Sequence, residues 1–339
     1  MQYSPCGQMD FSAAQAVHLP ADQQPLLLCV IDTEEEFDWE AEPSRSETGV
    51  RNLELIGRVQ DIFDDYAIAP CYVIDFPVAS KEQGYRELKK IANDGRCEIG
   101  AHLHPWVSPP FDEPLSRANM YPGNLSRDQE YAKLAELSAT IEENFGHRPS
   151  VYKAGRYGFG PNTLAILQSL GFDIDLSFCP PVDYRVDGGP DFTHCVATPS
   201  WLDDEKSVLE IPVTGAFTGC CGKWAHAVYQ QANRLKRFKV PAVLSRLSIV
   251  DRLMLSPEGF ASKEHIALTK YLFGRGVRTF TWSFHSSSVE PGCAPYVRND
   301  AELAEFLQSF RVFFDFFFNE LGGRAITPTG LKTLLESHQ

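Results

Sequence analysis

Short apolar runs alternate with longer segments of mixed polarity along the chain from residue 26 onwards. The runs are rich in Val, Ile, Leu and aromatic residues, a composition typical of strands that are buried on both faces. On this pattern we predict strands at 26–32, 69–75, 97–102, 151–154, 174–177, 209–213 and 278–285.

The segments between these runs repeat their apolar residues at a helical spacing. In 52–66, for example, Leu55, Val59 and Ile62 lie three or four residues apart. The segment 126–145 begins with Ser-Arg-Asp-Gln, a capping-box pattern, and is followed by Gly146. We predict helices at 52–66, 80–93, 126–145, 162–170, 257–274 and 300–321.

Strands that alternate with helices predict a parallel α/β fold. The number of strands is compatible with a barrel and with an open doubly wound sheet. The sequence contains neither G-x-G-x-x-G nor G-x-x-x-x-G-K-[ST], so no motif indicates a nucleotide-phosphate site. Residues 1–25 are weakly patterned, and we predict a mobile arm there, followed by a single domain at 26–325 with an insertion at 219–255.

Composition and charge narrow the class of protein. The 339 residues are 43% hydrophobic and 22% charged, which is typical of a globular protein and excludes disorder as the main theme. Asp and Glu outnumber Lys and Arg by 45 to 31, and a net charge of −14 argues against nucleic-acid binding. No stretch reaches the roughly 18 apolar residues of a membrane-spanning helix. The nine cysteines are scattered without a C-x-x-C pair, so together with the lack of a secretory signal we expect a cytoplasmic protein.

The charge is unevenly distributed. Acidic residues gather at 32–42, whereas the insertion is basic between 223 and 252. That basic stretch predicts contact with an anionic glycan, a sugar nucleotide or a membrane surface, with a solvated basic helix as the alternative. Its charged residues are Lys223, Arg234, Lys236, Arg237, Lys239, Arg246 and Arg252, against the single acid Asp251.

Reactive side chains collect where the predicted strands end. The first strand runs into Asp32-Thr33-Glu34-Glu35-Glu36, the third into His102 and His104, the fourth into Arg156 and Tyr157, and the last into His285. The carboxyl ends of parallel strands share one rim, where active sites of such folds lie. We therefore predict a catalytic site on this rim.

Two histidines separated by one residue point to the same side of an extended segment. His102 and His104, with a carboxylate from another strand, therefore match a metal site that keeps an open position for water. His285 is a candidate general acid, with Asp175 or Asp173 as the carboxylate that orients it. Asp75 at the end of the second strand is interpreted as a capping or supporting carboxylate.

In this order the segments resemble the polysaccharide deacetylase (NodB-like) family, and within it the WalW-like branch. The matching blocks are Asp32-Thr33-Glu34, Ile-Gly-Ala-His-Leu-His-Pro-Trp at 99–106, Ala-Gly-Arg-Tyr-Gly at 154–158, and an apolar strand that ends in His285. Together they cover residues 26 to 320. The resemblance implies a distorted (β/α) barrel of about seven parallel strands and a divalent metal, most often Zn²⁺.

The resemblance also implies hydrolytic removal of acetyl groups from an N-acetylated sugar or polysaccharide intermediate. On this sequence the metal ligands map to Glu34, His102 and His104. The base maps to Asp32 and the acid to His285, although Asp32 and Glu34 could exchange roles.

Further rim residues complete the implied catalytic and carbohydrate-binding site. Arg156 and Asp175 would support catalysis by orienting groups, and a backbone N–H near Arg156 would hold the oxyanion. Tyr157, Trp106 and Trp39 would bind the sugar, with core packing as the alternative for the tryptophans.

Two departures from the family pattern stand out. The histidines are two residues apart, where the family usually has about four, and Lys153 occupies the position of an arginine that normally holds a carboxylate. Lysine keeps the positive charge but loses the bidentate fork. Two other readings remain: an amidohydrolase acting on a small non-sugar C–N substrate with the same metal site, and a glycan-binding scaffold that has lost catalysis.

Overall fold

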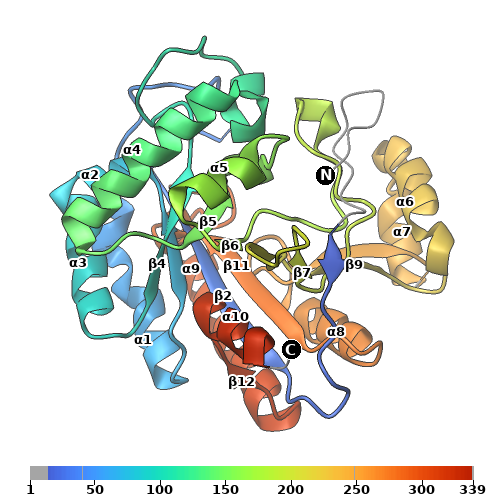
Figure 1. Cartoon of the computed structure of the whole chain (residues 1–339). Coiled ribbons are helices and arrows are strands. Elements are labelled where there is room, and N and C mark those ends of the chain that lie inside the picture. The colour runs from blue at the N-terminus through green and yellow to red at the C-terminus, as the bar shows by residue number, and fades with distance from the viewer. Residues whose placement is uncertain (1–13, 40, 248, 338–339) are drawn as a thin grey trace.

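A computed structural model describes residues 14–39, 41–247 and 249–337. Its centre is a parallel sheet in the order β8-β6-β5-β4-β3-β2-β11 (Figure 1). All of the predicted strands are present in it, and each neighbouring pair along this path is parallel. Their bounds are β2 (Leu26–Thr33), β3 (Cys71–Ile74), β4 (Glu98–Leu103), β5 (Val151–Ala154), β6 (Ile174–Asp175), β8 (Leu209–Glu210) and β11 (Thr279–His285).

The two ends of this path are joined by single hydrogen bonds rather than by a full ladder. The backbone N–H of Ser283 in β11 donates to the carbonyl of Leu255, and the N–H of Leu255 donates to the carbonyl of Thr214, which follows β8. The sheet therefore curls into a distorted (β/α) barrel of seven parallel strands, which decides between the two architectures left open by the sequence.

Shorter strands extend the sheet at its edges. β7 (Ser200–Trp201) lies antiparallel to β8, β1 (Gln15–Ala16) pairs antiparallel with β7, and β12 (Arg324–Ala325) pairs with the start of β2. The predicted N-terminal arm thus contains residues that pair with the sheet, and residues 1–13 lie outside the described part of the chain.

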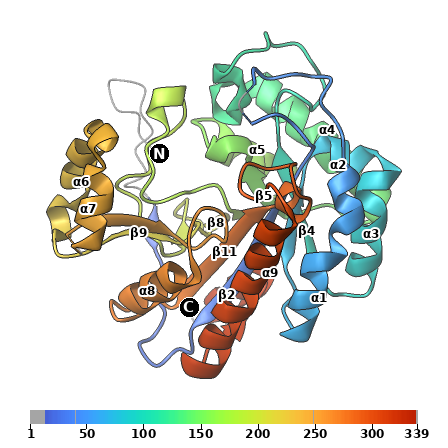
Figure 2. The same ribbon diagram turned by 180° about the vertical axis from the view of Figure 1, so that it is seen from behind.

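Helices surround the barrel (Figures 1 and 2). The capping box predicted at Ser126 is present at the start of α4, and Gly146 ends that helix with φ +84°. The predicted helix at 257–274 begins only at Ser262, which leaves Glu258 in a loop. The helices are α1 (Gly57–Asp65), α2 (Phe76–Ser80), α3 (Glu82–Asn93), α4 (Arg127–Phe145), α5 (Thr163–Leu170), α8 (Ser262–Phe273), α9 (Asp300–Phe314) and α10 (Pro328–Ser337), with short 3₁₀ turns and a π-helical turn at Asp315–Glu320.

The insertion forms a separate unit at the edge of the molecule. β9 (Gly215–Thr218) and β10 (Asp251–Met254) pair antiparallel, and the chain between them folds into α6 (Ala225–Arg234) and α7 (Val240–Arg246). Both views show α6 and α7 on the side of the molecule opposite α2 and α3 (Figures 1 and 2). None of the described helices is long and apolar enough to cross a membrane.

The alternation of side chains along the strands decides what enters the barrel. Every residue of β2 is buried, but Leu26, Leu28 and Val30 belong to the smaller apolar cluster that includes Leu331 and Leu335 of α10. The intervening residues of β2 pack in the larger cluster with the surrounding helices. Because successive side chains point to opposite faces, the next member of the first series is Asp32, so the barrel changes from an apolar interior to a polar one at the carboxyl end of the strands.

Candidate metal and catalytic site

Glu34, His102 and His104 converge at the carboxyl end of the barrel. Each side chain is at most 3% exposed, and one ligand atom from each lies within 4.8 Å of the others. The Glu34 Oε2 atom is 3.8 Å from Nε2 of His102 and 3.4 Å from Nε2 of His104. The structure thus brings together the three residues that the sequence predicted as metal ligands.

Both histidines are held from behind so that Nε2 faces Glu34. Nδ1 of His102 is 3.0 Å from the carbonyl oxygen of Lys153, and Nδ1 of His104 is 2.8 Å from Oε2 of Glu35. Hydrogen bonds of this kind fix the tautomer and orientation of metal-binding imidazoles. Oε1 of Glu34 is buried without a hydrogen-bond partner. The donor set and the orphaned oxygen fit a divalent cation.

The protonation preferences of the imidazoles agree with this fit. Burial is the largest cause that lowers the pKa of His102 well below its ordinary value, and burial also lowers the pKa of His104 to about 4. Both rings are therefore neutral at physiological pH, as metal ligation requires. Burial raises the pKa of Glu34 well above its usual range, so this carboxyl needs a positive partner to ionise.

Close packing on two sides holds the His104 ring. A Cβ on Gly155 would lie 2.7 Å from Cδ2 of His104 and 2.4 Å from the carbonyl oxygen of Leu103, so only glycine fits there. Trp106 stacks on His104 with ring centroids 4.1 Å apart and is 2% exposed. Trp106 therefore supports a candidate ligand from behind, which corrects the expectation that it faces the sugar.

Asp32 lies between two cationic groups on the same rim. Its Oδ1 accepts a hydrogen bond from Nζ of Lys153 at 2.5 Å, and its Oδ2 is 3.7 Å from Nε2 of His285. Burial alone would raise the pKa of Asp32, but Lys153, His102 and His285 together lower it below its ordinary value. The carboxylate is therefore ionised at neutral pH. Lys153 holds it with one hydrogen bond.

His285 is oriented by Glu258. Nδ1 of His285 is 2.7 Å from Oε2 of Glu258, whose Oε1 accepts from the backbone N–H of His285 at 3.0 Å and from the Ser288 hydroxyl at 2.5 Å. Burial alone would lower the pKa of His285, but Glu258, Glu34 and Asp32 raise it to about 10. Glu258 therefore holds the position that the sequence prediction gave to Asp175 or Asp173, and that prediction is wrong.

Asp175 belongs to a different cluster. Its Oδ1 accepts from the Ser177 hydroxyl at 2.6 Å, and it lies opposite Glu210 in the register of β6 and β8. Burial raises the pKa of Asp175 to about 6 and raises that of Glu210 well above its usual range. The neighbouring strand β8 thus supplies the partner of Asp175, because the pairing of strands and not their order in the chain decides which side chains meet.

Arg156 and Tyr157 form the turn after β5, where both residues have positive φ, +53° and +59°. Such backbone strain in residues other than glycine is concentrated at functional sites. The Arg156 guanidinium donates to the hydroxyl of Tyr121 at 3.3 Å, and the Tyr157 ring lies 5.0 Å from Nζ of Lys153. The turn therefore packs directly against the ammonium that holds Asp32.

Three further carboxylates, Asp75, Glu35 and Glu258, support the residues of this centre. The carboxylate of Asp75 accepts from the backbone N–H groups of Glu35 and Val78, which confirms its predicted capping role. Glu35 in turn holds His104, although the sequence shows it only as one member of an acidic run. Glu258 lies in a stretch that the periodicity assigned to a helix, so no signal marked it as a rim residue.

Trp39 lies on the open side of the rim. Its ring is half-buried and meets His285 edge-on, with centroids 4.8 Å apart, and it also contacts Tyr296. Trp106 is buried behind His104, and Trp282 of β11 is fully buried in the aromatic core beside α9. Trp39 is thus the one placed to contact a bound molecule next to His285.

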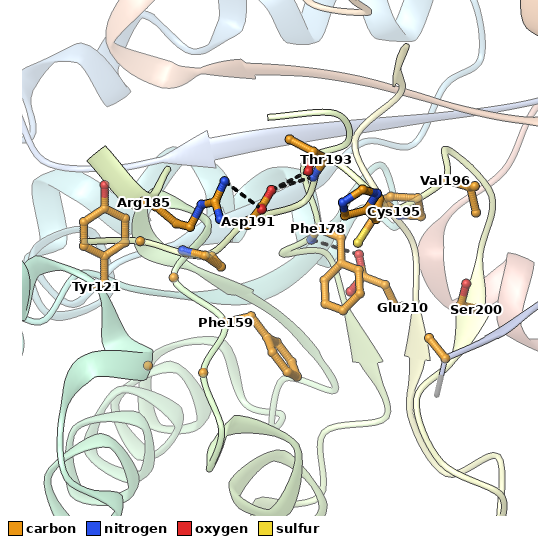
Figure 3. A pocket seen from close by; sticks show the side chains of 18 of the residues that line it. Tyr121, Phe159, Phe178, Arg185, Asp191, Thr193, Cys195, Val196, Ser200 and Glu210 are labelled. Atoms are coloured by element: carbon orange, nitrogen blue, oxygen red, sulfur yellow. Dashed lines mark hydrogen bonds and ion pairs between the residues drawn. The ribbon is translucent and has the colours of Figure 1, made fainter. Parts of the chain in front are cut away.

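A cavity of about 810 Å³ opens beside this centre, between the loops after β5 and β6 and helix α6 (Figure 3). Tyr121 and Gly158 line it, and Tyr121 also contacts Arg156, so the cavity adjoins the catalytic rim. Glu210 lines it, and so do Arg185 and Asp191, which form an ion pair (Figure 3). None of the three candidate metal ligands lines it.

The role of Lys153 can be tested through the pH dependence of activity. We expect Lys153→Met to raise the pKa of Asp32, because only His102 and His285 would then counteract the rise in this pKa that burial causes. The acidic limb of the kcat/KM profile should move to higher pH, and the folded state should lose about 3–5 kcal/mol because a buried carboxylate loses its partner. Lys153→Arg keeps the positive charge, so the acidic limb should stay at low pH. The exposed Lys90→Met should change neither the acidic limb nor the free energy of unfolding. An acidic limb that stays in place in Lys153→Met would contradict this role.

The role of Glu258 can be tested on the alkaline side of the pH profile of kcat/KM. Because Glu258 helps to raise the pKa of His285 to about 10, Glu258→Gln should let the imidazole lose its proton at lower pH. The alkaline limb of kcat/KM should then shift downwards, while the half-exposed Glu87→Gln leaves it unchanged. If the limb does not move in Glu258→Gln, a group other than His285 donates the proton.

Comparisons with known proteins identify the fold. No protein-family model and no curated protein matches the chain. A candidate polysaccharide deacetylase from Mycobacterium smegmatis has a similar structure, with a TM-score of 0.51, 14% identity, and coverage of 95% of this chain and 93% of that one. At this identity the similarity shows a shared fold, which confirms the predicted fold class.

Two further solved structures are similar at TM-scores below 0.5. One is a family 4 acetyl xylan esterase from Clostridium thermocellum in complex with a cobalt ion, with a TM-score of 0.43, 14% identity and 91% of both chains covered. The other is the peptidoglycan deacetylase PdaC from Bacillus subtilis, with a TM-score of 0.43, 9% identity, and coverage of 94% of this chain and 95% of that one.

Proposed function

We propose that this chain is a metal-dependent hydrolase of the polysaccharide deacetylase (NodB-like) type, which removes acetyl groups from an N-acetylated sugar or polysaccharide intermediate. The observation that carries the proposal is the position of Asp32. It lies between Lys153 and His285, on the rim that also brings together Glu34 and the two histidines. The barrel fold and the four sequence blocks support the same reading.

Glu34, His102 and His104 would hold the cation, and we propose Zn²⁺ because two imidazoles and one carboxylate are a common set in catalytic zinc sites. A divalent cation at this position would act as a Lewis acid that polarises the acetyl carbonyl and makes water more acidic. The geometry favours Glu34 as the carboxylate ligand, because Asp32 is engaged by Lys153 instead.

Asp32 and His285 would carry the proton transfers. Asp32 is ionised at neutral pH, so it can accept a proton from the attacking water. His285 keeps its proton up to a pKa of about 10, so it can donate one to the leaving amine. The base and the acid thus have pKa values pushed in opposite directions by their surroundings, as general acid–base catalysis requires. The products are acetate and a free amino sugar.

The remaining predicted rim residues would act on the substrate. The strained turn at Arg156 and Tyr157 would present backbone N–H groups to the developing oxyanion. Trp39, beside His285, would stack on a sugar ring, since aromatic faces combine apolar contact with a tolerance for polar edges.

The proposal is tested by acetate release. We would strip the purified chain with a chelator, reload it with Zn²⁺, and measure acetate and free amine from N-acetylglucosamine oligomers and from small cyclic amides. We expect acetate only from the sugars, only after reloading, and at the same rate in the exposed control variant Lys90→Met. Turnover of the amides but not of the sugars would favour an amidohydrolase. Stoichiometric zinc without any turnover would favour a glycan-binding scaffold.

A further inference from the structure

The insertion between β9 and β10 exposes an unusual share of apolar surface. Five of the twelve large apolar side chains that are exposed in the described structure lie within residues 224–247. Trp224 is 65% exposed, Leu247 63% and Phe238 61%, and Leu235 and Val243 are about half exposed. Single exposed apolar side chains need no explanation, but a cluster of this kind marks an interaction surface.

Helix α6 has two lining faces, one toward the cavity beside the catalytic rim and one toward an apolar groove. His226 and Gln230, one helical turn apart, line the cavity beside the catalytic rim. The other face borders an apolar groove of about 510 Å³ between α6 and α7, lined by Trp224, Ala227, Val228, Gln231, Ala232, Leu235, Val240 and Leu244. Residues of the insertion alone line this groove, so packing against the barrel does not account for the second face of α6.

The same unit is strongly basic. Between residues 219 and 250 there is no Asp or Glu, whereas the whole chain carries a net charge of −14. Arg234, Arg237, Lys239 and Arg246 are exposed, and the Arg237 guanidinium lies 4.6 Å from the centre of the Phe238 ring. Exposed basic and exposed apolar side chains are therefore interspersed along the sequence of α6, α7 and the turn between them.

We propose that this surface, residues 224–247, docks onto a lipid bilayer that contains anionic headgroups. Exposed Trp, Phe and Leu side chains enter the boundary between headgroups and acyl chains, and the neighbouring Arg and Lys side chains bind the negative headgroups. A soluble polyanion would match the basic residues but leave the apolar ones exposed. A second copy of the chain would cover the groove but bring two basic surfaces together.

Docking would hold one wall of the cavity at the bilayer, because His226 and Gln230 of α6 line that cavity. A sugar attached to a membrane lipid would then be presented beside the catalytic rim. This last step rests on the proposed deacetylase function, whereas docking itself does not, so vesicle binding and acetate release can fail independently.

The test is co-sedimentation of the full chain with vesicles. We expect binding to vesicles of phosphatidylcholine in which about a third of the lipid is anionic phosphatidylglycerol. Binding to phosphatidylcholine alone should be weak, and high salt should release the bound protein. Arg234→Gln with Arg237→Gln should weaken binding roughly thirtyfold. Trp224→Ser with Phe238→Ser should weaken it at least about tenfold. The matched controls Arg298→Gln and Val186→Ser, which are exposed elsewhere, should bind as the unchanged chain does.

A fluorescence measurement checks the same contact directly. Brominated lipids should quench the emission of the unchanged chain, and Trp224→Phe should remove that quenching. Equal binding to neutral and anionic vesicles, or full binding by both double variants, would overturn the proposal. So would binding of dextran sulfate that competes fully with vesicles and is insensitive to the apolar variant. A dimer in solution that the same substitutions dissociate would assign the surface to a second copy instead.

Discussion

If the proposed deacetylase function holds, Asp32→Asn loaded with Zn²⁺ should lose nearly all acetate release and still bind the metal. Asparagine has almost the same shape as aspartate, but it cannot accept the proton of the attacking water. Loss of a general base costs about 10²–10⁴-fold in rate. Because Asp32 contacts Lys153 and His285 and not the candidate ligand histidines, we expect the metal content to stay at one ion per chain.

The measurement is kcat for acetate release together with the zinc content of the same preparation. The exposed Asp94→Asn is the matched control and should match the unchanged chain in both. If Asp32→Asn loses zinc, Asp32 is a ligand, and the roles of Asp32 and Glu34 are exchanged. If it keeps zinc and retains activity within about tenfold, Asp32 is not the base.

His104→Ala should remove the metal and the activity together. Altering only the hydrogen-bond partner of a metal-binding histidine typically costs 10–100-fold in affinity, so loss of the ligand itself should cost more than about a hundredfold. Glu35→Gln, which keeps the ring but weakens the group behind it, should fall in the smaller range. The readouts are the zinc dissociation constant, measured with a competing chelator, and acetate release at saturating zinc.

Two controls separate metal loss from misfolding. His147→Ala changes an exposed histidine and should leave zinc binding intact. His104→Ala leaves a cavity beside Trp106, so its circular dichroism and denaturant midpoint need to be compared with those of the unchanged chain. A folded His104→Ala variant that binds zinc as tightly as the parent would refute the assignment.

The strands and the rim could be predicted from the sequence because both depend on local pattern. Continuous apolar runs mark strands that are buried on both faces. The same runs end in Asp32, His102 and His285, and a parallel sheet must bring those ends to one edge. Nothing beyond strand direction was needed to place the candidate ligands near each other.

The partners of the rim residues could not be predicted, because they depend on which segments lie side by side in space. Glu258 reaches His285 from a loop that follows the insertion, and its stretch has a helical pattern. The sequence predicts Asp175 or Asp173 as the partner of His285, but Asp175 lies beside Glu210, since β8 pairs with β6. The cavity is similarly built from segments as distant in sequence as Ala16, Tyr121 and His226.

One part of the proposed docking surface, residues 224–247, could be predicted from the sequence and the other could not. Its charge was visible in the sequence as a basic stretch between 223 and 252. Its apolar component was not, because the sequence does not show which faces of α6 and α7 remain uncovered. Only the packed structure separates the face of α6 that lines the cavity from the face that borders the groove.

An anomalous-scattering map of crystals grown with Zn²⁺ tests most directly whether Glu34, His102 and His104 form a metal centre. We predict a single strong peak in contact with the Glu34 carboxylate and with Nε2 of both histidines, with Asp32 held by Lys153 beside it. A zinc-saturated crystal with no peak there, or with zinc held instead by Glu36, Glu290 and Cys293, would contradict a metal centre at Glu34, His102 and His104.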